Sequence, residues 1–260
     1  MDLQLTGYAA LVTGGSEGIG KAAALELARE GAHVAICARR SDVLGAAAEE
    51  IRRHATGKVV EVVADVTRHE DIERFVQEAH RQFGRVDILV NNAGTAAGAA
   101  FDTVPDEAWD SDLNLKLMGA IRASQAAIPH MKQQGGGRII NITHVGGKAP
   151  GPNSLPSSVS RAAGIALTKA MSKDLATHNI LVNTICVGVI KSGQISRAAT
   201  TRYPDVPLED AYKKMAAPIP LGRIGEAREV AALVTLLASP LGGYVTGASI
   251  NVDGGMGATV

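Results

Sequence analysis

Aromatic residues are scarce in this chain of 260 residues, where they make up 3% of the sequence and include a single tryptophan. So few aromatic side chains provide no platform on which the bases of a nucleic acid could stack. A net charge is also missing, because 26 Lys and Arg residues balance 26 Asp and Glu residues. Without a basic surface field, we expect neither nucleic acid nor an anionic membrane as a partner. The partners still to be expected are a small molecule or a second copy of the chain.

Long apolar runs, a signal peptide and metal-binding motifs are absent as well. No apolar run approaches the roughly 18 residues that suggest a membrane span, and no basic stretch precedes an apolar one near the N-terminus. We therefore expect a soluble, cytoplasmic protein. The only cysteines, Cys37 and Cys186, lie in apolar runs and are interpreted as packing residues rather than a disulfide. The seven histidines form no close pair and no HExxH motif, so we expect no metal site.

What the chain does contain is a regular alternation of β-rich and helical runs. Helical stretches such as residues 18–32 separate the apolar runs and show a helical period. This alternation predicts an α/β fold with a parallel sheet covered by helices on both faces. The expected strands are residues 8–13, 33–38, 59–64, 87–92, 138–142, 180–186 and 248–252.

Residues 189–222 break this rhythm. The segment is long and punctuated by prolines, and structureless segments of that length in compact domains often serve as lids or binding loops. Because no repeat, low-complexity tract or linker-like change of composition divides the chain, we predict one domain over residues 1–260, with a lid or substrate loop at about 189–222.

A glycine-rich loop follows the first expected strand. The segment TGGSEGIG (13–20) opens a helix and places glycines at 14, 18 and 20. Glycine lets the backbone turn sharply and lets a pyrophosphate approach the N–H groups at the helix N-terminus. The spacing differs from the standard G-x-G-x-x-G fingerprint, but its position directly after the first strand favours a dinucleotide site over an ordinary turn.

Several further motifs follow in a recognisable order: Asp65 in ADV, the run NNAG at 91–94, Asn114 in NL, and the ending YVTGASINVDGG at 244–255. Together with the glycine-rich loop, they make essentially the whole chain resemble the classical short-chain dehydrogenase/reductases. The resemblance implies a single Rossmann-type, doubly wound domain with seven parallel strands, a nicotinamide cofactor, and a homotetramer or dimer.

The resemblance also implies which residues bind the cofactor. The adenine would be held by Asp65 and Val66. The segment with Asn91, Ala93 and Gly94 would run past the ribose and stabilise the central strands, and Ser192 would bind the nicotinamide carboxamide. The expected cofactor-binding residues are Gly14, Ser16, Gly18, Ile19, Gly20, Arg39, Asp65, Val66, Asn91, Ala93, Gly94, Arg161, Gly188, Ile190 and Ser192. The proline that usually starts the segment before Ser192 is Val187 here.

The end of the second strand distinguishes the two nicotinamide cofactors. A carboxylate there binds the free ribose of NAD, whereas an arginine neutralises the 2′-phosphate of NADP. Ala38 stands at the acidic position and Arg39 follows it. NADP is therefore favoured, with NAD as the alternative. Glu17 in the glycine-rich loop weighs against a phosphate.

The catalytic positions depart from the family pattern. That pattern is an asparagine, a serine, a tyrosine and a lysine four residues after the tyrosine. Alignment on the V-x-G that follows residue 144 places His144 at the serine, Ser157 at the tyrosine and Arg161 at the lysine, so only Asn114 is kept. A serine hydroxyl is far less acidic than a phenol, so Ser157 cannot simply inherit the proton-donor role.

Imidazole titrates near neutrality and can donate a proton or polarise a carbonyl. The sharpest hypothesis is an NADPH-dependent reductase of a carbonyl or activated double bond, in which His144 is the proton donor. Ser157 would position the substrate, Arg161 would hold the cofactor because arginine keeps its proton, and Asn114 would support a water. Tyr203 or Tyr212 from the 189–222 segment is a second possible donor.

The sequence also allows a comparison with two other functions. The chain could be a catalytically retired member that binds NAD(P) as a sensor or as a partner subunit, since a fold alone does not define a function. A hydrolase is disfavoured because no G-x-S-x-G motif and no evident orienting carboxylate accompany Ser157 and His144.

The expected substrate is small and uncharged or flat, although Lys148 and Lys191 leave an anionic tail open. The expected helices at 105–134 and 157–178 are candidate contacts between subunits.

Overall fold

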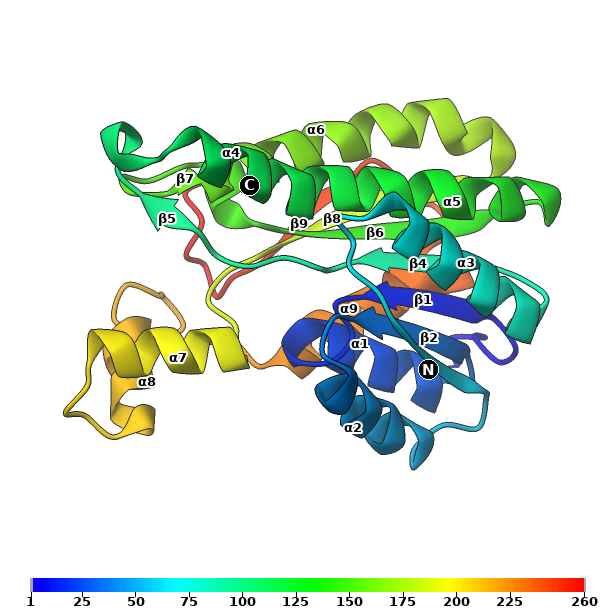
Figure 1. The fold of residues 1–260 in the computed structure, drawn as a ribbon, viewed down its shortest axis with the longest axis horizontal. Coiled ribbons are helices and arrows are strands. Elements are labelled where there is room, and N and C mark those ends of the chain that lie inside the picture. The colour runs from blue at the N-terminus through cyan, green and yellow to red at the C-terminus, as the bar shows by residue number, and fades with distance from the viewer. Residues whose placement is uncertain (1, 260) are drawn as a thin grey trace.

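The computed structural model describes residues 2–259 and contains the predicted α/β domain (Figure 1). Its main sheet has seven strands, all parallel, in the order β3-β2-β1-β4-β6-β8-β9. The observed strand ends differ from the expected ones by at most two residues. The strands are β1 (Ala9–Thr13), β2 (His33–Ala38), β3 (Val59–Val63), β4 (Ile88–Asn91), β6 (Gly137–His144), β8 (Ile180–Val187) and β9 (Ser249–Val252).

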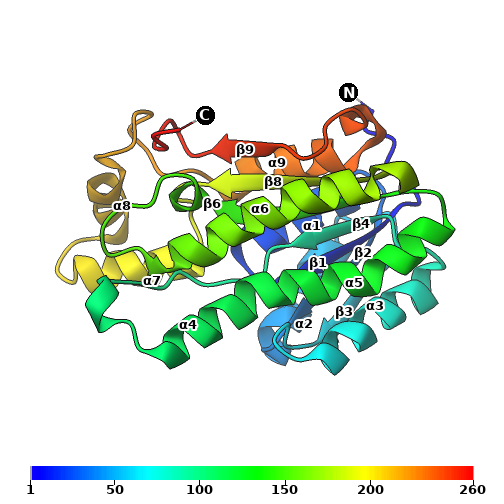
Figure 2. The same ribbon diagram turned by 90° about the horizontal axis from the view of Figure 1, so that it is seen from above.

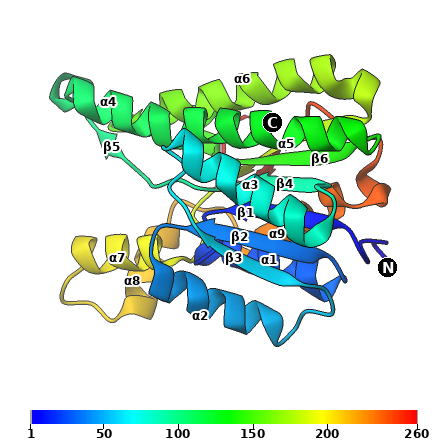
Figure 3. The same cartoon turned by 45° about the vertical axis from the view of Figure 1, so that its right-hand side comes forward.

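Helices cover both faces of this sheet, as Figures 1 and 3 show. One face carries α1 (Gly18–Arg29), α2 (Ser41–Arg52) and α9 (Ala227–Ala238). The other carries α3 (His69–Phe83), α5 (Gly119–Gln133) and α6 (Ser157–Leu175). Central strands β1, β4 and β8 are buried along their whole length, which explains why they read as continuous apolar runs rather than as alternating patterns.

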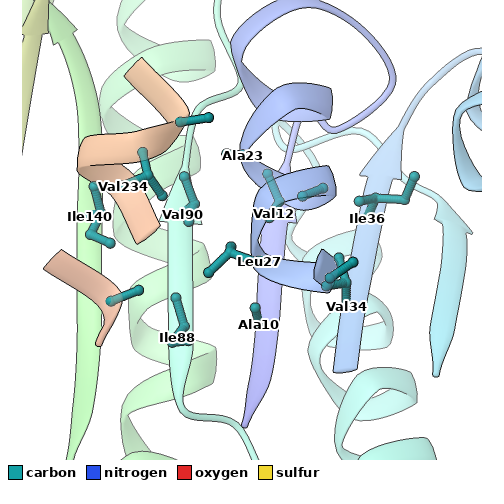
Figure 4. Close-up of a cluster of buried hydrophobic side chains, with 14 of the residues drawn as sticks. Ala10, Val12, Ala23, Leu27, Val34, Ile36, Ile88, Val90, Ile140 and Val234 are labelled. Carbon is teal, nitrogen blue, oxygen red and sulfur yellow. The ribbon is translucent and has the colours of Figure 1, made fainter. Parts of the chain in front are cut away.

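The core between α1, α9 and the sheet is built from aliphatic side chains (Figure 4). Leu27 of α1 and Val234 of α9 are fully buried there, among strand residues such as Val12 and Val90. Alanines at 23, 24 and 28 let α1 approach the sheet closely. The scarcity of aromatic residues is therefore matched by a core of Val, Ile, Leu and Ala.

Shorter elements surround the carboxyl ends of the strands. A two-stranded antiparallel pair joins β5 (Gly98–Ala99) to β7 (Leu155–Pro156), two loops far apart in sequence. The expected helix at 105–134 is divided into α4 (Asp106–Leu113), a π-helical turn η2 (Asn114–Met118) and α5. The short 3-10 turns are η1 (Phe101–Thr103), η3 (Val145–Gly147), η4 (Ala176–His178) and η5 (Pro240–Gly242).

The segment at 189–222 is not a structureless loop. It forms α7 (Gly193–Arg202) and α8 (Leu208–Ala216), which enclose a small apolar cluster of their own around Ala199 and Tyr212. Figure 2 shows β8 and β9 pointing toward this pair of helices, which lies beyond the carboxyl ends of the strands. The segment is therefore placed beside the edge where a ligand would bind.

Core packing generates the first prediction. Leu27→Ala is expected to lower the free energy of unfolding by about 2–5 kcal/mol, because it leaves a cavity in a fully buried cluster. The measurement is urea unfolding followed by circular dichroism. Leu221→Ala, at a leucine that is 66% exposed, is the control and should change the stability by less than about 0.5 kcal/mol. Equal losses in the two variants would contradict this description of the core.

Candidate active site

A cleft of about 990 Å³ runs along the carboxyl ends of the strands. It crosses the gap between β1 and β4, where the strand order reverses direction along the chain. In doubly wound sheets ligands bind at this switch point. The cleft extends from Arg39, just after β2, to His144 at the end of β6 and Ser157 at the start of α6. Its size suits a large organic ligand.

The glycine-rich loop forms one wall of the cleft at the N-terminus of α1. Gly14 and Gly18 adopt left-handed backbone angles, with φ of 65° and 55°, where a side chain would cause strain. Gly20 has a packing role instead, because a Cβ there would lie 2.3 Å from the carbonyl oxygen of Gly14. The loop thus turns sharply and brings the free N–H groups of the helix N-terminus to the cleft.

Most residues expected to bind the cofactor line this cleft. They are Gly14, Ser16, Gly18, Ile19, Arg39, Asp65, Val66, Ala93, Gly94, Arg161, Gly188, Ile190 and Ser192. Gly20 and Asn91 do not line it. The Asn91 side-chain amide donates to Asn141 Oδ1 at 2.9 Å and to Ser124 Oγ at 3.2 Å, so Asn91 ties the central strands to α5 and acts behind the cleft wall.

Asn114 begins the π-helical turn η2 and also lies outside the cleft lining. Its backbone carbonyl accepts a hydrogen bond from Arg122 at 3.5 Å. The extra residue in this turn shifts the register of the helix. Lys116, two residues further along η2, is buried and points toward the start of α6, where it contacts Ser157.

Ser157 lies at the junction of three elements. Its Oγ accepts a hydrogen bond from the backbone N–H of Ala97 at 2.9 Å and another from Lys116 Nζ at 2.5 Å. Ala97 directly precedes β5 and Ser157 directly follows β7, so the β5–β7 pairing sets the first of these contacts. Ser157 also lines the cleft. Ser157, which the resemblance aligns with the tyrosine position, thus lies at the cleft, whereas the resemblance gave no indication of Lys116.

A buried ion pair supports this serine. Asp112 Oδ1 accepts from Lys116 Nζ, and the two side chains are only 4% and 2% exposed. Asp112 Oδ2 accepts from Ser160 Oγ at 2.6 Å. Burial lowers the pKa of Lys116, opposed by the bond to Asp112 and assisted by the positive charge of Arg161. Sequence reasoning missed both Asp112 and Lys116, although their i,i+4 spacing is the one signal available for a paired set.

Arg161 on α6 lines the cleft and is anchored to β6. Its Nη1 donates to the carbonyl oxygen of Ile142 at 2.8 Å. A Cβ at Gly94 would come within 3.0 Å of its Nη2, so the glycine makes room for the guanidinium. Burial lowers the pKa of Arg161, yet a guanidinium keeps its proton under physiological conditions. Arg161 therefore contributes a fixed positive charge and does not exchange its proton.

His144 ends β6 and faces the cleft. Its Nδ1 accepts a hydrogen bond from the backbone N–H of Gly146 at 2.9 Å. Burial lowers the pKa of His144, with further lowering from Arg161 and Lys116 and a smaller opposing effect of Asp253. The neutral ring with its proton on Nε2 fits these contacts. They do not suit the expected role of His144 as the proton donor, because the cation that would have to form is disfavoured.

The alternative donors in the 189–222 segment are placed elsewhere. The hydroxyl of Tyr212 bonds to Ser196 Oγ at 2.7 Å, and Tyr203 packs against the apolar cluster between α7 and α8. Neither tyrosine lines the cleft. The lysines that left an anionic tail open are engaged too, since Lys148 donates to the Ser249 carbonyl and Lys191 pairs with Glu226.

Three other expectations concern metal ions, the two cysteines and membrane spans. Among residues 2–259, no set of three or more His, Cys, Asp and Glu side chains could hold a metal ion. His80 and His130 are far apart in sequence, but their rings stack at 4.2 Å between α3 and α5. Both cysteines are free and buried, and burial raises the pKa of Cys37 to about 12. No helix in the described part of the chain is long and apolar enough to cross a membrane.

The fold and the cleft define a doubly wound domain with a dinucleotide-type binding edge, and comparison with known proteins defines the family. A family model described as enoyl-(acyl carrier protein) reductase matches residues 14–257. The 3-oxoacyl-[acyl-carrier-protein] reductase FabG of Thermotoga maritima is 36% identical over 257 residues, covering 98% of this chain and 99% of that protein. The chain belongs to the short-chain dehydrogenase/reductase family, and it is an oxidoreductase of that family.

Solved structures agree with this assignment. L-sorbose reductase from Gluconobacter frateurii, complexed with NADPH and L-sorbose, superposes with a TM-score of 0.96 at 32% identity and full coverage of both chains. The Pseudomonas aeruginosa RhlG/NADP active-site complex superposes with a TM-score of 0.88 at 34% identity, covering 98% of each chain. The single Rossmann-type domain is thus confirmed.

The surroundings of His144 generate the second prediction. Nitrogen-15 spectra of the protein are expected to show the neutral Nε2–H form at pH 7 and a pKa below about 6.5, the ordinary value. Because the folded pKa lies below the unfolded one, the unfolded chain binds more protons as the pH falls. The contribution of His144 to stability is therefore present above the unfolded pKa and is lost as the pH falls through the folded pKa. The His144→Asn variant identifies the signal. A Nδ1–H form, or a pKa above the ordinary value, would contradict the described contacts.

Proposed function

We propose that the chain catalyses the NADPH-dependent reduction of a carbonyl group in a small organic substrate. The observation that supports this function is one continuous cleft with two chemically different ends. A helix N-terminus and Arg39 lie at one end, and both favour an anion. His144 and Ser157 lie at the other end, with Arg161 between them and the strands, and these groups can donate hydrogen bonds to a developing alkoxide.

The residues present fit the cofactor. A Cβ at Gly14 would lie 3.0 Å from Ala93 Cα, and a Cβ at Gly18 would lie 3.1 Å from Ser192 Cβ, so both glycines keep the cradle open. Gly14, Ser16 and Gly18 would hold the pyrophosphate, Asp65 and Val66 the adenine, and Ser192 the carboxamide. Bound NADPH supplies a hydride. Arg161 serves as the fixed cation beneath the nicotinamide end of the cleft.

Arg39 would bind the 2′-phosphate that distinguishes NADPH from NADH. Its neighbour Arg40 forms an ion pair with Glu17, so the carboxylate that weighed against a phosphate is neutralised. Arg39 is exposed, lines the cleft and has no ion-pair partner among residues 2–259. The Gluconobacter structure contains NADPH and the Pseudomonas structure contains NADP.

His144 would polarise the substrate carbonyl through Nε2–H. This role replaces the hypothesis that it gives up a proton, and it uses the neutral ring favoured by Gly146 and by burial. Neutral imidazole is a sufficient hydrogen-bond donor to a carbonyl oxygen. Asn114 would act at a distance from the substrate, by starting the turn that carries Lys116.

The substrate is expected to be small and uncharged at its reactive end. That part of the cleft is lined by small residues: Thr95, Ala96, Ala97, Gly98, Ala149 and Gly151. The relatives point to carbonyl compounds of two kinds, 3-oxoacyl thioesters and L-sorbose, and the description of the family model adds the activated double bond of an enoyl thioester.

We also propose a homo-oligomer, with exposed Met118 and Val159 on the helical face that meets a second copy.

Cofactor choice gives the third prediction. Arg39→Ala is expected to raise the Kd for NADPH about 10- to 100-fold, because a hydrogen bond to a charged group contributes about 1.5–3 kcal/mol. The Kd for NADH should change little, since NADH has no 2′-phosphate. The measurement is titration followed by nicotinamide fluorescence. The matched control is Arg53→Ala, at an exposed arginine near the end of α2. Equal weakening of both cofactors would contradict the role given to Arg39.

Turnover gives the fourth prediction. The wild-type protein is expected to consume NADPH with at least one member of a panel containing a 3-oxoacyl thioester, L-sorbose and simple cyclic ketones, read from the absorbance of the reduced nicotinamide. His144→Ala should lower kcat/KM about 100- to 1,000-fold, the usual effect of removing one donor to a developing oxyanion. NADPH binding without turnover of any member of this panel, or of an added enoyl thioester, would indicate the sensor or partner-subunit function instead.

A further inference from the structure

We propose that Lys116 is the source of the proton in this reaction and that Ser157 passes it to the substrate oxygen. The inference rests on the proposed carbonyl reduction and adds a residue that the family pattern does not contain. Ser157 and Lys116 would together supply what a single phenol supplies elsewhere, a proton delivered to a developing alkoxide.

The hydrogen bonds around Ser157 fix the direction of its proton. A hydroxyl has one donor and two acceptor positions. The N–H of Ala97, at 2.9 Å, and the Nζ of Lys116, at 2.5 Å, occupy both acceptor positions. The remaining direction is the one in which the Ser157 hydroxyl can donate, and Ser157 lines the cleft. A serine placed in this way is a donor toward the ligand and is in contact with a cation behind it.

The short side chain of Ser157 sets where the substrate must lie. A tyrosine at this position would extend into the cleft, whereas serine leaves that space open. The substrate carbonyl can therefore approach the start of α6 and reach the serine hydroxyl directly. The small residues on the opposite loop, Ala96, Ala97 and Gly98, leave the same region free of bulky side chains.

The charges around Lys116 suit a proton donor. Asp112 on α4 pairs with its ammonium group, and Ser160 on α6 orients that carboxylate at 2.6 Å. Arg161 on α6 and neutral His144 on β6 also face this group. Two cations and one carboxylate leave one net positive charge near the developing alkoxide, which stabilises it. Burial and Arg161 lower the pKa of Lys116 toward the range in which an ammonium gives up its proton.

Hydride adds to the carbonyl carbon, and the electron pair of the C=O π bond moves onto the oxygen. That oxygen takes the proton from Ser157 Oγ as an O–H bond forms, and Ser157 Oγ takes one proton from Lys116 Nζ. The products are the alcohol, an intact serine, a neutral lysine amine and oxidised NADP. Solvent returns the proton to Lys116 before the next turnover.

Hydrolysis by a serine nucleophile fits these contacts less well. A nucleophilic serine needs a base that is free of its proton in the resting state. The carboxylate of Asp112 instead favours the ammonium form of Lys116. The arrangement therefore favours donation of a proton by Ser157 over attack on a carbonyl carbon.

The test compares Lys116→Met, Ser157→Ala, the double variant and Lys173→Met, an exposed lysine on the same helix as Ser157. Circular dichroism and the Kd for NADPH are measured first, and both should be unchanged in all four proteins. With the best carbonyl substrate of the panel, we expect kcat to fall 100-fold or more in each single variant. The double variant should be no slower than the single ones, because the two residues act as a unit. Lys173→Met should match the wild type.

Two further readouts separate proton donation from a structural role. In the wild type, kcat should fall as pH rises through the pKa of Lys116, and this fall should be absent in Lys116→Arg, whose guanidinium keeps its proton. In protein with carbon-13-labelled lysine and no NADPH, the Lys116 side chain should titrate below the ordinary lysine value of about 10.4. A Lys116→Met protein that binds NADPH and retains wild-type kcat would overturn the relay alone. A wild-type protein that reduces no carbonyl would overturn the proposed function and the relay with it.

Discussion

The parallel direction of all seven strands is the constraint on which the site depends. Because every strand runs the same way, the carboxyl ends of β1, β2, β4, β6 and β8 meet at one edge of the sheet. The glycine-rich loop, Arg39, Gly94, His144 and Gly188 follow or end these strands one by one, and all of them line the same cleft. Residues separated by up to 174 positions, from Gly14 to Gly188, are thus brought together by strand pairing rather than by local sequence.

A second constraint is electrostatic. Two cations lie near the start of α6, Arg161 on α6 itself and Lys116 on η2, and Lys116 pairs with the buried carboxylate of Asp112 on α4. The β5–β7 pairing then brings Ser157 to the cation through Ala97. The π-helical turn that begins at Asn114 shifts the register of the helix at the position of Lys116, which is buried and faces Ser157. Ser157, Lys116 and Asp112 therefore form one connected group.

The fold could be predicted from the sequence because its signals are local. Continuous apolar runs mark strands buried on both faces, and the glycines after β1 mark a turn that only small residues permit. The long segment at 189–222 was harder, because its prolines suggested a loop although α7 and α8 build a core of their own.

Parts of the site could not be predicted, because they depend on contacts made across the fold. An Asp and a Lys four residues apart on a helix read as an exposed pair, and nothing local indicates that Asp112 and Lys116 are buried. The form of the His144 ring depends on the N–H of Gly146, which sequence does not place.

We propose that one cleft positions a reduced nicotinamide against the group formed by His144, Ser157 and Lys116. A crystal structure of the protein with NADP bound tests it most directly. We expect the pyrophosphate at the N-terminus of α1, the 2′-phosphate against Arg39, and the nicotinamide ring beside His144 and Arg161. A cofactor bound in the reverse direction, or a nicotinamide ring out of reach of a substrate held by Ser157, would contradict it.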